Sequence, residues 1–283
     1  MKHIPVLLNE VIAVLKPQPG EFFIDGTFGS GGHAQEIIEK IGPSGKFLGI
    51  DWDKKQLEKL MTCDVINGNF AELPEILEER NLSKANGLLL DLGFCSEQLE
   101  SGRGFGFMGP EEPLLMTYNQ EVIPVKDWLK KLSEKELTKI IREFGEERYA
   151  DRISRAIKQS RRPIETNKKL AEIIQQAVPR NYEHGRIQPA TRTFLALRIF
   201  ANQELLNLEK VLYSLEKILK VGGRVAIISF NSLEDRLVKN YFREKAKEGK
   251  LEILTKKPIR PSLEEIKNNP RSRSAKLRAA KIL

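Results

Sequence analysis

The chain has 283 residues, of which 40% are hydrophobic and 30% are charged, the balance of a soluble globular protein. No apolar run approaches the roughly 20 residues that span a bilayer, and the N-terminus has no signal-peptide core. The two cysteines, Cys63 and Cys95, are too few for a disulfide framework or a four-cysteine zinc site. These features predict a cytoplasmic protein without a membrane partner.

The net charge of +8 is concentrated near the C-terminus. Residues 256–283 hold nine lysines and arginines against Glu264 and Glu265, and three prolines interrupt the first part of this segment. Such a segment is either a solvated end or an arm that contacts the phosphates of a nucleic acid. The sequence leaves both interpretations open.

Strands and helices alternate in the first third of the chain. A short amphipathic helix at 4–15 is expected to end before Pro17. Apolar runs and helical periodicity predict strands at 22–24, 46–51, 64–66 and 86–91 and helices at 35–41, 53–60 and 71–80. This alternation predicts an α/β fold with a doubly wound parallel sheet and ligand chemistry at the carboxyl ends of its strands.

The pattern changes after Asp91. Residues 92–119 are rich in glycine and proline and predict a long functional loop. Helices are expected at 125–132, 133–144, 146–160, 167–178 and 190–202, the second of them opened by a capping box at Ser133 and Glu136. We therefore predict an all-helical insertion domain at 103–204 that divides a sheet domain into 1–102 and 205–283.

The alternation resumes after the insertion. A helix at 205–219 is expected to end at Gly222-Gly223, and strands are expected at 224–230, 251–254 and 275–282. Ser232 is the predicted N-cap of a helix that runs to about Lys247, with Asp235 three residues on.

A glycine-rich loop joins the first strand to its helix. Gly29-Ser30-Gly31-Gly32-His33-Ala34 fits the pattern G-x-G-x-x-G/A, and Asp51 lies 20 residues beyond Gly31, where a ribose-binding acid belongs. This pattern suits NAD and S-adenosylmethionine alike. Asp25, ahead of the glycines, favours the methyl donor, because a carboxylate repels a pyrophosphate and attracts a sulfonium or ammonium group. The second half of the chain also lacks an obvious histidine or lysine for hydride chemistry.

Sequence motifs along the whole chain resemble those of the MraW family, bacterial methyltransferases of 16S rRNA. They are His3-Ile4-Pro5-Val6-Leu7-Leu8-Asn9-Glu10, Asp25-Gly26-Thr27-Phe28-Gly29-Ser30-Gly31-Gly32-His33, Asp91-Leu92-Gly93 with Gln98-Leu99, Arg103-Gly104-Phe105, Tyr149-Ala150-Asp151-Arg152-Ile153, Pro189-Ala190-Thr191-Arg192-Thr193-Phe194, Ile228-Ser229-Phe230, Ser232-Leu233-Glu234-Asp235-Arg236 and Asn269-Pro270-Arg271-Ser272-Arg273-Ser274.

This resemblance implies a Rossmann-like class I methyltransferase sheet interrupted by an all-helical, substrate-recognising domain. It implies methyl transfer from S-adenosylmethionine to N4 of a cytidine in the decoding region of 16S rRNA, within the small ribosomal subunit. No metal is expected to take part. A homodimer remains open.

The resemblance also implies roles for individual residues. Gly31, Gly32 and His33 would contact the methionine end of the donor; Asp51 would bind its ribose, Phe70 would cover its adenine, and Asp91 and Gln98 would close the pocket near the methyl group. Asp25 and Gly29 are further candidate donor-binding residues, Asp25 because its carboxylate attracts the positive charge of the donor. Asp91 is also the candidate catalytic residue, as an acceptor for the amino protons of the target base. Candidates for contacts with RNA are Arg103, Arg192, Asn231, Arg236, Arg271 and Arg273. An intramolecular carboxylate partner is the alternative role for Arg103, Arg192 and Arg236. The alternative for Asp91 is that it only orders the loop or binds the donor. His33 could assist the chemistry, and its alternative role is to shape the loop or contact the donor.

The chain departs from the family pattern on the substrate side. Met116-Thr117-Tyr118-Asn119 stands where the family has Met-Arg-Met-Asp, Asn231 stands where it has His, and Cys95 replaces a serine. Phe94, usually a small aliphatic residue, could stack on a flipped base or simply pack. These changes raise an alternative: a donor-binding ribosome-assembly factor with reduced or lost methyl transfer.

Overall fold

The computed structural model describes residues 4–54, 63–93, 96–99 and 101–283. Most of the helix expected at 53–60, and both Phe94 and Cys95, lie outside the described residues. The chain forms two compact units, one of Met1–Gly93 with Leu205–Leu283 and one of Phe94–Glu204. We refer to them as the sheet unit and the helical unit.

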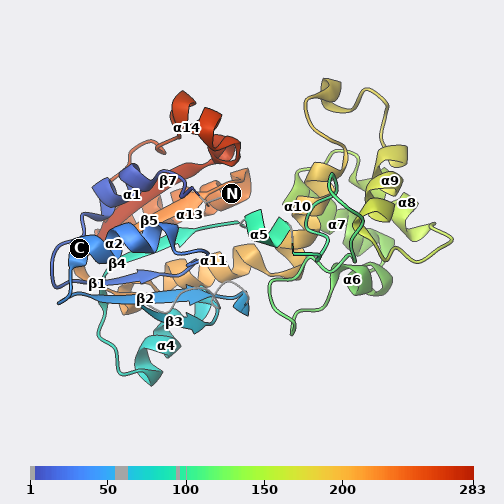
Figure 1. Cartoon of the computed structure of the whole chain (residues 1–283). Helices are drawn as coiled ribbons and strands as arrows, with labels where there is room; N and C mark the ends of the chain where they lie inside the picture. The colour runs from blue at the N-terminus through green and yellow to red at the C-terminus, as the bar shows by residue number, and fades with distance from the viewer. Residues whose placement is uncertain (1–3, 55–62, 94–95, 100) are drawn as a thin grey trace. The chain divides into compact units, whose positions relative to one another are not determined.

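The sheet unit contains a seven-stranded sheet in the order β3-β2-β1-β4-β5-β7-β6 (Figure 1). Its strands are β1 (Phe22–Asp25), β2 (Lys46–Asp51), β3 (Asp64–Asn67), β4 (Ala85–Asp91), β5 (Leu219–Ser229), β6 (Leu251–Ile253) and β7 (Lys276–Ile282). The first five strands pair in parallel, and β7 runs antiparallel to both β5 and β6. This arrangement confirms the predicted doubly wound α/β fold. The strand order reverses between β1 and β4, which is where such sheets bind ligands.

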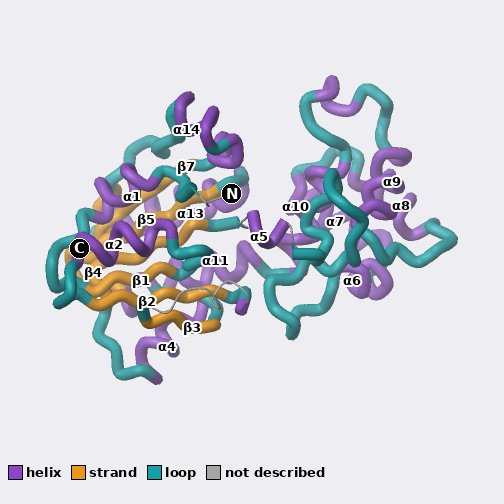
Figure 2. The backbone as a smooth tube through the Cα atoms, in the orientation of Figure 1, coloured by secondary structure: helices purple, strands orange, loops and turns teal. Residues whose placement is uncertain are grey.

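Alternating residues of the central strands face two different hydrophobic cores. Phe23, Leu89 and Ala226 point to the face covered by α1 (Leu8–Leu15) and α2 (Gly32–Ile41). Their neighbours Ile24, Leu88 and Val225 point to the opposite face. That face is covered by η1 (Phe70–Glu72), α4 (Leu73–Glu79), α11 (Glu204–Tyr213), α12 (Leu215–Ile218) and α13 (Ser232–Lys247) (Figure 2). The period of two along each strand thus produces a three-layer unit.

Two local predictions for the second half of this unit are wrong. The helix expected at 205–219 is broken at Ser214 into α11 and α12, and β5 begins at Leu219, ahead of the two glycines. Leu219 is extended because it pairs with Ala85, and the register then shifts so that Gly87 pairs with Arg224. Gly222 and Gly223 therefore lie within an irregular part of the strand. The N-cap of α13 is Asn231 rather than Ser232.

The helical unit consists of α5 (Ser96–Leu99), α6 (Val125–Lys131), α7 (Glu134–Gly145), α8 (Ala150–Lys158), α9 (Asn167–Ala177), η2 (Tyr182–Gly185) and α10 (Ala190–Ala201). The predicted capping box at the start of α7 is present, with Ser133 and Glu136 exchanging hydrogen bonds. Leu137, Ile141, Ile153 and Leu197 from three of these helices share one buried core.

The boundary between the units differs from the predicted one. We expected the insertion to begin after residue 102, whereas the compact units divide after Gly93. Leu99 of α5 packs against the core of the helical unit, so the short helix belongs with the residues that follow it. The role of this unit in substrate recognition remains a proposal.

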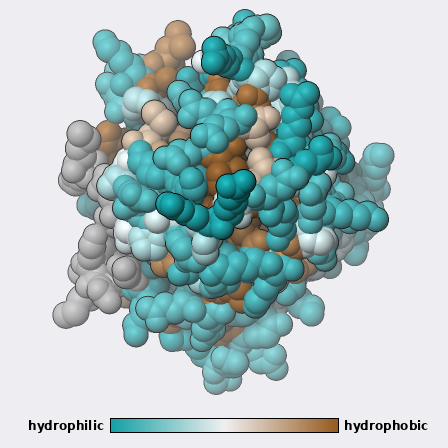
Figure 3. All heavy atoms as spheres, turned by 90° about the vertical axis from the view of Figure 1, so that its right-hand side faces the viewer, coloured by the Kyte–Doolittle hydropathy of each residue, from teal (hydrophilic) through white to brown (hydrophobic). Residues whose placement is uncertain are grey.

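The described part of the chain contains no helix that is long and apolar enough to cross a membrane. On the face shown in Figure 3, hydrophilic side chains predominate and hydrophobic atoms are visible mainly between them, toward the middle of the view. The apolar residues of the helices contribute to the three buried cores.

Candidate functional site at the carboxyl edge of the sheet

Two acids lie where the strand order reverses. Asp25 ends β1 and Asp91 ends the neighbouring β4. Thr27 connects them: its backbone N–H donates to Asp25 Oδ1 (3.0 Å), and its hydroxyl accepts from the backbone N–H of Asp91 (2.6 Å). The sequence reasoning missed Thr27, whose only signal was its place in the Asp25-Gly26-Thr27 motif.

The environment of both acids disfavours their negative charge. Asp25 is 2% exposed, and burial raises its pKa to about 7 against the lowering effect of its hydrogen bonds from Thr27. Burial also raises the pKa of Asp91 well above its usual value, with smaller contributions from Asp25 and Glu234. Asp91 Oδ1 is buried without a hydrogen-bond partner among the described residues. A buried acceptor of this kind indicates a place for a donor or a cation from a ligand.

The glycine loop follows Asp25 and turns tightly into α2. Gly31 is in the left-handed conformation (φ 74°) at the N-cap of α2, which begins at Gly32, three residues before the predicted start. A Cβ at Gly32 would lie 2.6 Å from Pro5 Cγ, so the N-terminal segment packs directly on the loop.

His33 shapes this loop. It is 5% exposed, and its Nε2–H donates to the carbonyl of Val6 (2.9 Å), since a carbonyl can only accept. Its Nδ1 is 3.9 Å from Asp91 Oδ2, too far for a hydrogen bond. The structure thus gives His33 a structural role, and its contact with a donor remains a prediction.

Asp51 holds the other side of the loop. At the end of β2 its two carboxylate oxygens accept the backbone N–H groups of Gly29 and Asp53, each at 2.8 Å. A carboxylate can accept several hydrogen bonds at once, so the same group could also accept a ribose hydroxyl. Phe70, at the start of η1, is partly exposed, and its Cβ would lie 3.0 Å from a Cβ at Gly26. The predicted ribose and adenine residues therefore flank the same loop.

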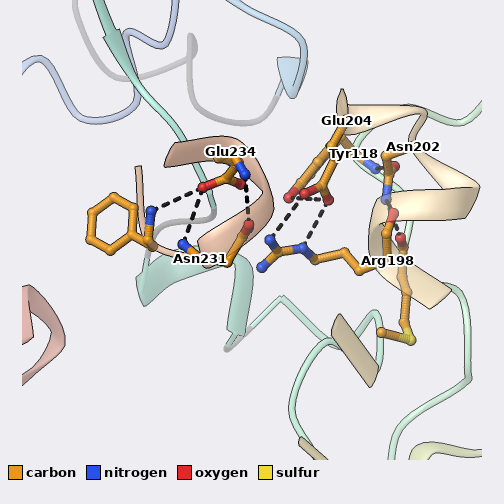
Figure 4. Close-up of polar contacts among 8 residues, drawn as sticks. Tyr118, Arg198, Asn202, Glu204, Asn231 and Glu234 are labelled. Carbon is orange, nitrogen blue, oxygen red and sulfur yellow. Dashed lines mark hydrogen bonds and ion pairs between the residues drawn. The ribbon is translucent and has the colours of Figure 1, made fainter. Parts of the chain in front are cut away.

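Asn231 and Glu234 form a capping box where β5 leads into α13 (Figure 4). Asn231 Oδ1 accepts from the N–H groups of Leu233 and Glu234, both at 3.0 Å. Glu234 is 3% exposed, and its Oε2 accepts from the N–H groups of Phe230 (2.9 Å) and Asn231 (3.3 Å). The sequence reasoning missed Glu234, although the spacing Asn-x-x-Glu is a capping-box signal.

In the helical unit, the residues that depart from the family pattern make internal hydrogen bonds. The Tyr118 hydroxyl donates to Glu204 Oε1 (3.1 Å), and its N–H donates to Asn202 Oδ1 (3.0 Å) (Figure 4). The carboxylate of Glu204 also accepts two hydrogen bonds from the Arg198 guanidinium, from Nε at 2.8 Å and from Nη2 at 3.0 Å. Thr117 is buried, and the Asn119 side chain accepts from the N–H of Glu121. The substituted residues are thus integrated into the fold of this unit.

Two of the arginines predicted to hold RNA have partners within this unit. Arg103 donates to Ser101 Oγ (2.8 Å) and to the carbonyls of Thr117 and Tyr118. Arg192 pairs with Glu183 at 3.0 Å. Gln98, predicted to close the donor pocket, is buried in the helical unit, and that role remains a prediction.

The basic C-terminal segment is divided between core and surface. Arg278 of β7 is 8% exposed and pairs with Asp235 at 2.6 Å, and Lys276 pairs with the same carboxylate. Arg271 and Arg273 lie on η3 (Pro270–Ser274), next to α14 (Leu263–Asn268), and are exposed, as is Arg236 on α13. The exposed cations, rather than the whole segment, therefore remain candidates for phosphate contacts.

The fold and this edge define a Rossmann-like methyltransferase. The sheet differs from the dinucleotide-binding order 3-2-1-4-5-6 by the antiparallel β7 between β5 and β6.

The chain belongs to the MraW methylase family, whose model matches residues 1–283. Its relatives include the protein named ribosomal RNA small subunit methyltransferase H in Thermotoga neapolitana, 45% identical over 99% of this chain and 96% of that one. The protein of the same name in Trichlorobacter lovleyi is 43% identical over 99% of this chain and 98% of that one. Membership of this family excludes the NAD alternative.

Proposed function

We propose that this protein transfers a methyl group from S-adenosylmethionine to N4 of a cytidine in the decoding region of 16S rRNA. The observation that carries this proposal is the pair of buried acids, Asp25 and Asp91, beside a glycine loop in a chain of the MraW methylase family. The names of the relatives support ribosomal RNA of the small subunit as the substrate class.

The residues at this edge fit a cationic nucleoside donor. Asp25, which is buried, and Asp91 lie at one edge of the sheet, His33 Nδ1 lies 3.9 Å from Asp91 Oδ2, and Asp91 Oδ1 has no hydrogen-bond partner among the described residues. Glycine at position 32 lets Pro5 of the N-terminal segment pack directly on the loop backbone. In this proposal Asp25, Gly29, Gly31, Gly32 and His33 hold the methionine part, Asp51 and Phe70 hold the nucleoside, and Gln98 closes the pocket.

Bound S-adenosylmethionine would supply an electrophilic methyl group. The chain's contribution begins with position, because placing the target nitrogen in line is worth up to about 7–11 kcal/mol. The N4 lone pair of cytosine is delocalised into the ring, so the amine is a poor nucleophile. Asp91 Oδ1 accepts a hydrogen bond from this amine, which localises the lone pair, and takes the proton that the amine must lose. Its raised pKa makes this carboxylate a better proton acceptor than an exposed one.

The acceptor side of the proposal rests on surface charge and on the helical unit. Exposed Arg236, Arg271 and Arg273 are suited to contact RNA phosphates. Arg103 and Arg192 already donate hydrogen bonds to groups of the protein, and they would have to bind RNA in addition to these groups. The helical unit, 103–204 in the predicted division, would recognise the substrate. Cytoplasmic location, the intact small subunit as partner and a homodimer belong to the same proposal.

The test uses purified protein, radiolabelled S-adenosylmethionine and 30S subunits from cells that lack this gene. We expect the wild type to label 16S rRNA on cytidine N4. Asp91→Asn should transfer about 10²–10⁴-fold more slowly, since it loses the proton acceptor. Asp64→Asn, an exposed carboxylate of the same unit paired with Arg80, is the matched control and should be fully active.

Donor binding measured in parallel distinguishes the alternatives. Saturable binding of donor by the wild type without any methyl transfer would contradict the proposal and support the assembly-factor reading. Full activity of Asp91→Asn would be compatible with methyl transfer but would contradict the role of Asp91 as proton acceptor.

A further inference from the structure

The Asn231 side chain has an orientation fixed by its cap. Because Oδ1 accepts two backbone N–H groups, the other end of the amide must be the Nδ2 donor. Nδ2 is buried and has no partner among the described residues. The cap uses only half of the side chain, so capping alone does not account for the amide nitrogen.

Asn231 follows the strand next to Asp91. Asp91 of β4 pairs with Ile228 of β5, and the N–H of Leu92 donates to the Ile228 carbonyl (2.9 Å). Just beyond, a Cβ at Gly93 would lie 3.4 Å from the Phe230 ring. Glu234, the partner of Asn231 in the capping box, is close enough to act on the charge of Asp91. The two chain segments thus leave the same edge of the sheet side by side.

Among the described residues of this edge, three buried polar atoms have no hydrogen-bond partner: Asp91 Oδ1, which accepts, Asn231 Nδ2, which donates, and the Ser30 hydroxyl of the glycine loop, which can do either. Asp91 and Asn231, which follow neighbouring strands, supply one acceptor and one donor. Cytosine presents the complementary pair, an exocyclic amine as donor next to ring N3 as acceptor. Uracil presents the reverse, a carbonyl oxygen next to an N3–H. A site that must hydrogen-bond a substrate group discriminates strongly against a base with the opposite pattern.

We propose that Asn231 Nδ2 donates a hydrogen bond to ring N3 of the target base while Asp91 Oδ1 accepts from its amine. The inference rests on the proposed function and adds to it a residue that positions the base. It assigns Asn231 two simultaneous tasks, helix capping through Oδ1 and base recognition through Nδ2.

Two substitutions separate these tasks. Asn231→Asp and Asn231→Ser each keep a side-chain oxygen for the cap and remove the amide donor. The serine variant is neutral, so it controls for the extra charge that aspartate places near Asp91 and Glu234. Asn231→Ala removes both functions and reports on the value of the cap through thermal unfolding.

The assay measures kcat and KM for 30S subunits, and Kd for S-adenosylmethionine, with each folded variant. We expect both Asp and Ser variants to unfold at nearly the wild-type temperature and bind the donor within about twofold. Their kcat should fall about ten- to hundred-fold, with little change in KM, because the substitutions leave the arginines proposed to bind RNA phosphates unchanged.

Three results would overturn the inference: wild-type kcat in Asn231→Ser, loss of activity in Asn231→Asp alone, or a large loss of donor binding in Asn231→Ser. Wild-type kcat in Asn231→Ser would mean that Asn231 only caps the helix. Loss of activity in Asn231→Asp alone would mean that the position is only sensitive to charge. Loss of donor binding in Asn231→Ser would mean that Asn231 belongs to the donor site. If the wild-type protein itself transfers no methyl group, the proposed function is contradicted. The wild-type assay therefore distinguishes failure of the proposed function from failure of the inference about Asn231.

Discussion

At the scale of single residues, the site depends on carboxyl groups that the fold keeps away from water. Asp25 ionises at a cost, because it lies at the end of a fully buried strand and, among the described residues, hydrogen bonds from Thr27 alone compensate its charge. Asp91 is held close by through the same threonine. Such a pair is unfavourable in the absence of a ligand and favourable around a cation. These two carboxyl groups are therefore placed in advance to attract a cationic ligand.

This arrangement predicts how stability changes with pH. The pKa of Asp25 is raised to about 7 in the folded chain from 3.8 in the unfolded one, so the folded state binds the proton more tightly. The stabilisation is complete below about pH 4 and is lost as pH rises to about 7, at up to roughly 1.4 kcal/mol per pH unit. The raised pKa of Asp91 acts in the same direction.

Denaturant unfolding of the donor-free protein at several values between pH 5 and 8 measures this effect. Asp25→Asn should make the free energy of unfolding less dependent on pH in this range, whereas Asp64→Asn should not. An Asp25→Asn variant with the wild-type slope would show that Asp25 is not the group responsible.

At the scale of elements, the sequence predicted strands and helices correctly where a single hydrophobic pattern continued without interruption. The continuous apolar runs Phe22–Ile24 and Leu88–Leu90 predicted buried strands, and both faces of these strands are indeed buried. The prediction that failed at α13 had two overlapping patterns, Asn231-x-x-Glu234 and Ser232-x-x-Asp235. Asp235 is engaged by Lys276 and Arg278 of the distant β7, which leaves Glu234 to complete the box. Only the tertiary structure could decide between the two registers.

The candidate site was predictable to the same extent. Asp25, Asp51 and Asp91 could be anticipated as neighbours, since each ends a parallel strand at one edge of the sheet. Thr27 bridging two of them, and Pro5 against Gly32, depend on contacts that no local pattern encodes. The unpartnered Nδ2 of Asn231 was likewise invisible, because it follows from how the cap orients the side chain.

At the scale of the whole molecule, the C-terminal arm reaches the glycine loop through the N-terminal segment, all within the sheet unit. The N–H of Leu7 donates to Glu265 Oε1 (2.8 Å), a partner 258 positions away, and Asn269 Nδ2 donates to the Ile4 carbonyl (3.1 Å). This same segment packs on Gly32 through Pro5 and accepts from His33 through Val6. The two ends of the chain thus support the loop that is expected to hold the donor.

Removing a contact between the C-terminal part of the chain and the N-terminal segment should weaken donor binding. We call these contacts, from Glu265 and Asn269 to residues 4–7, the terminal clamp. We expect Glu265→Ala to raise the Kd for S-adenosylmethionine several-fold, because the Leu7 N–H loses its acceptor and the segment under Gly32 becomes less ordered. Glu265→Gln keeps an oxygen at that position and should bind nearly normally. Exposed Glu264→Ala removes the same charge from α14 without this contact and is the matched control. Calorimetric titration with equal affinities for Glu265→Ala and Glu264→Ala would contradict the terminal clamp.

The central claim is methyl transfer to one cytidine of the small-subunit RNA. Mass spectrometry of oligonucleotide fragments of 16S rRNA, from cells with and without this gene, tests it most directly. The account predicts that N4 methylation at a single decoding-region cytidine disappears with the gene and returns with the wild-type protein but not with Asp91→Asn. Unchanged cytidine methylation in cells that lack the gene would contradict it.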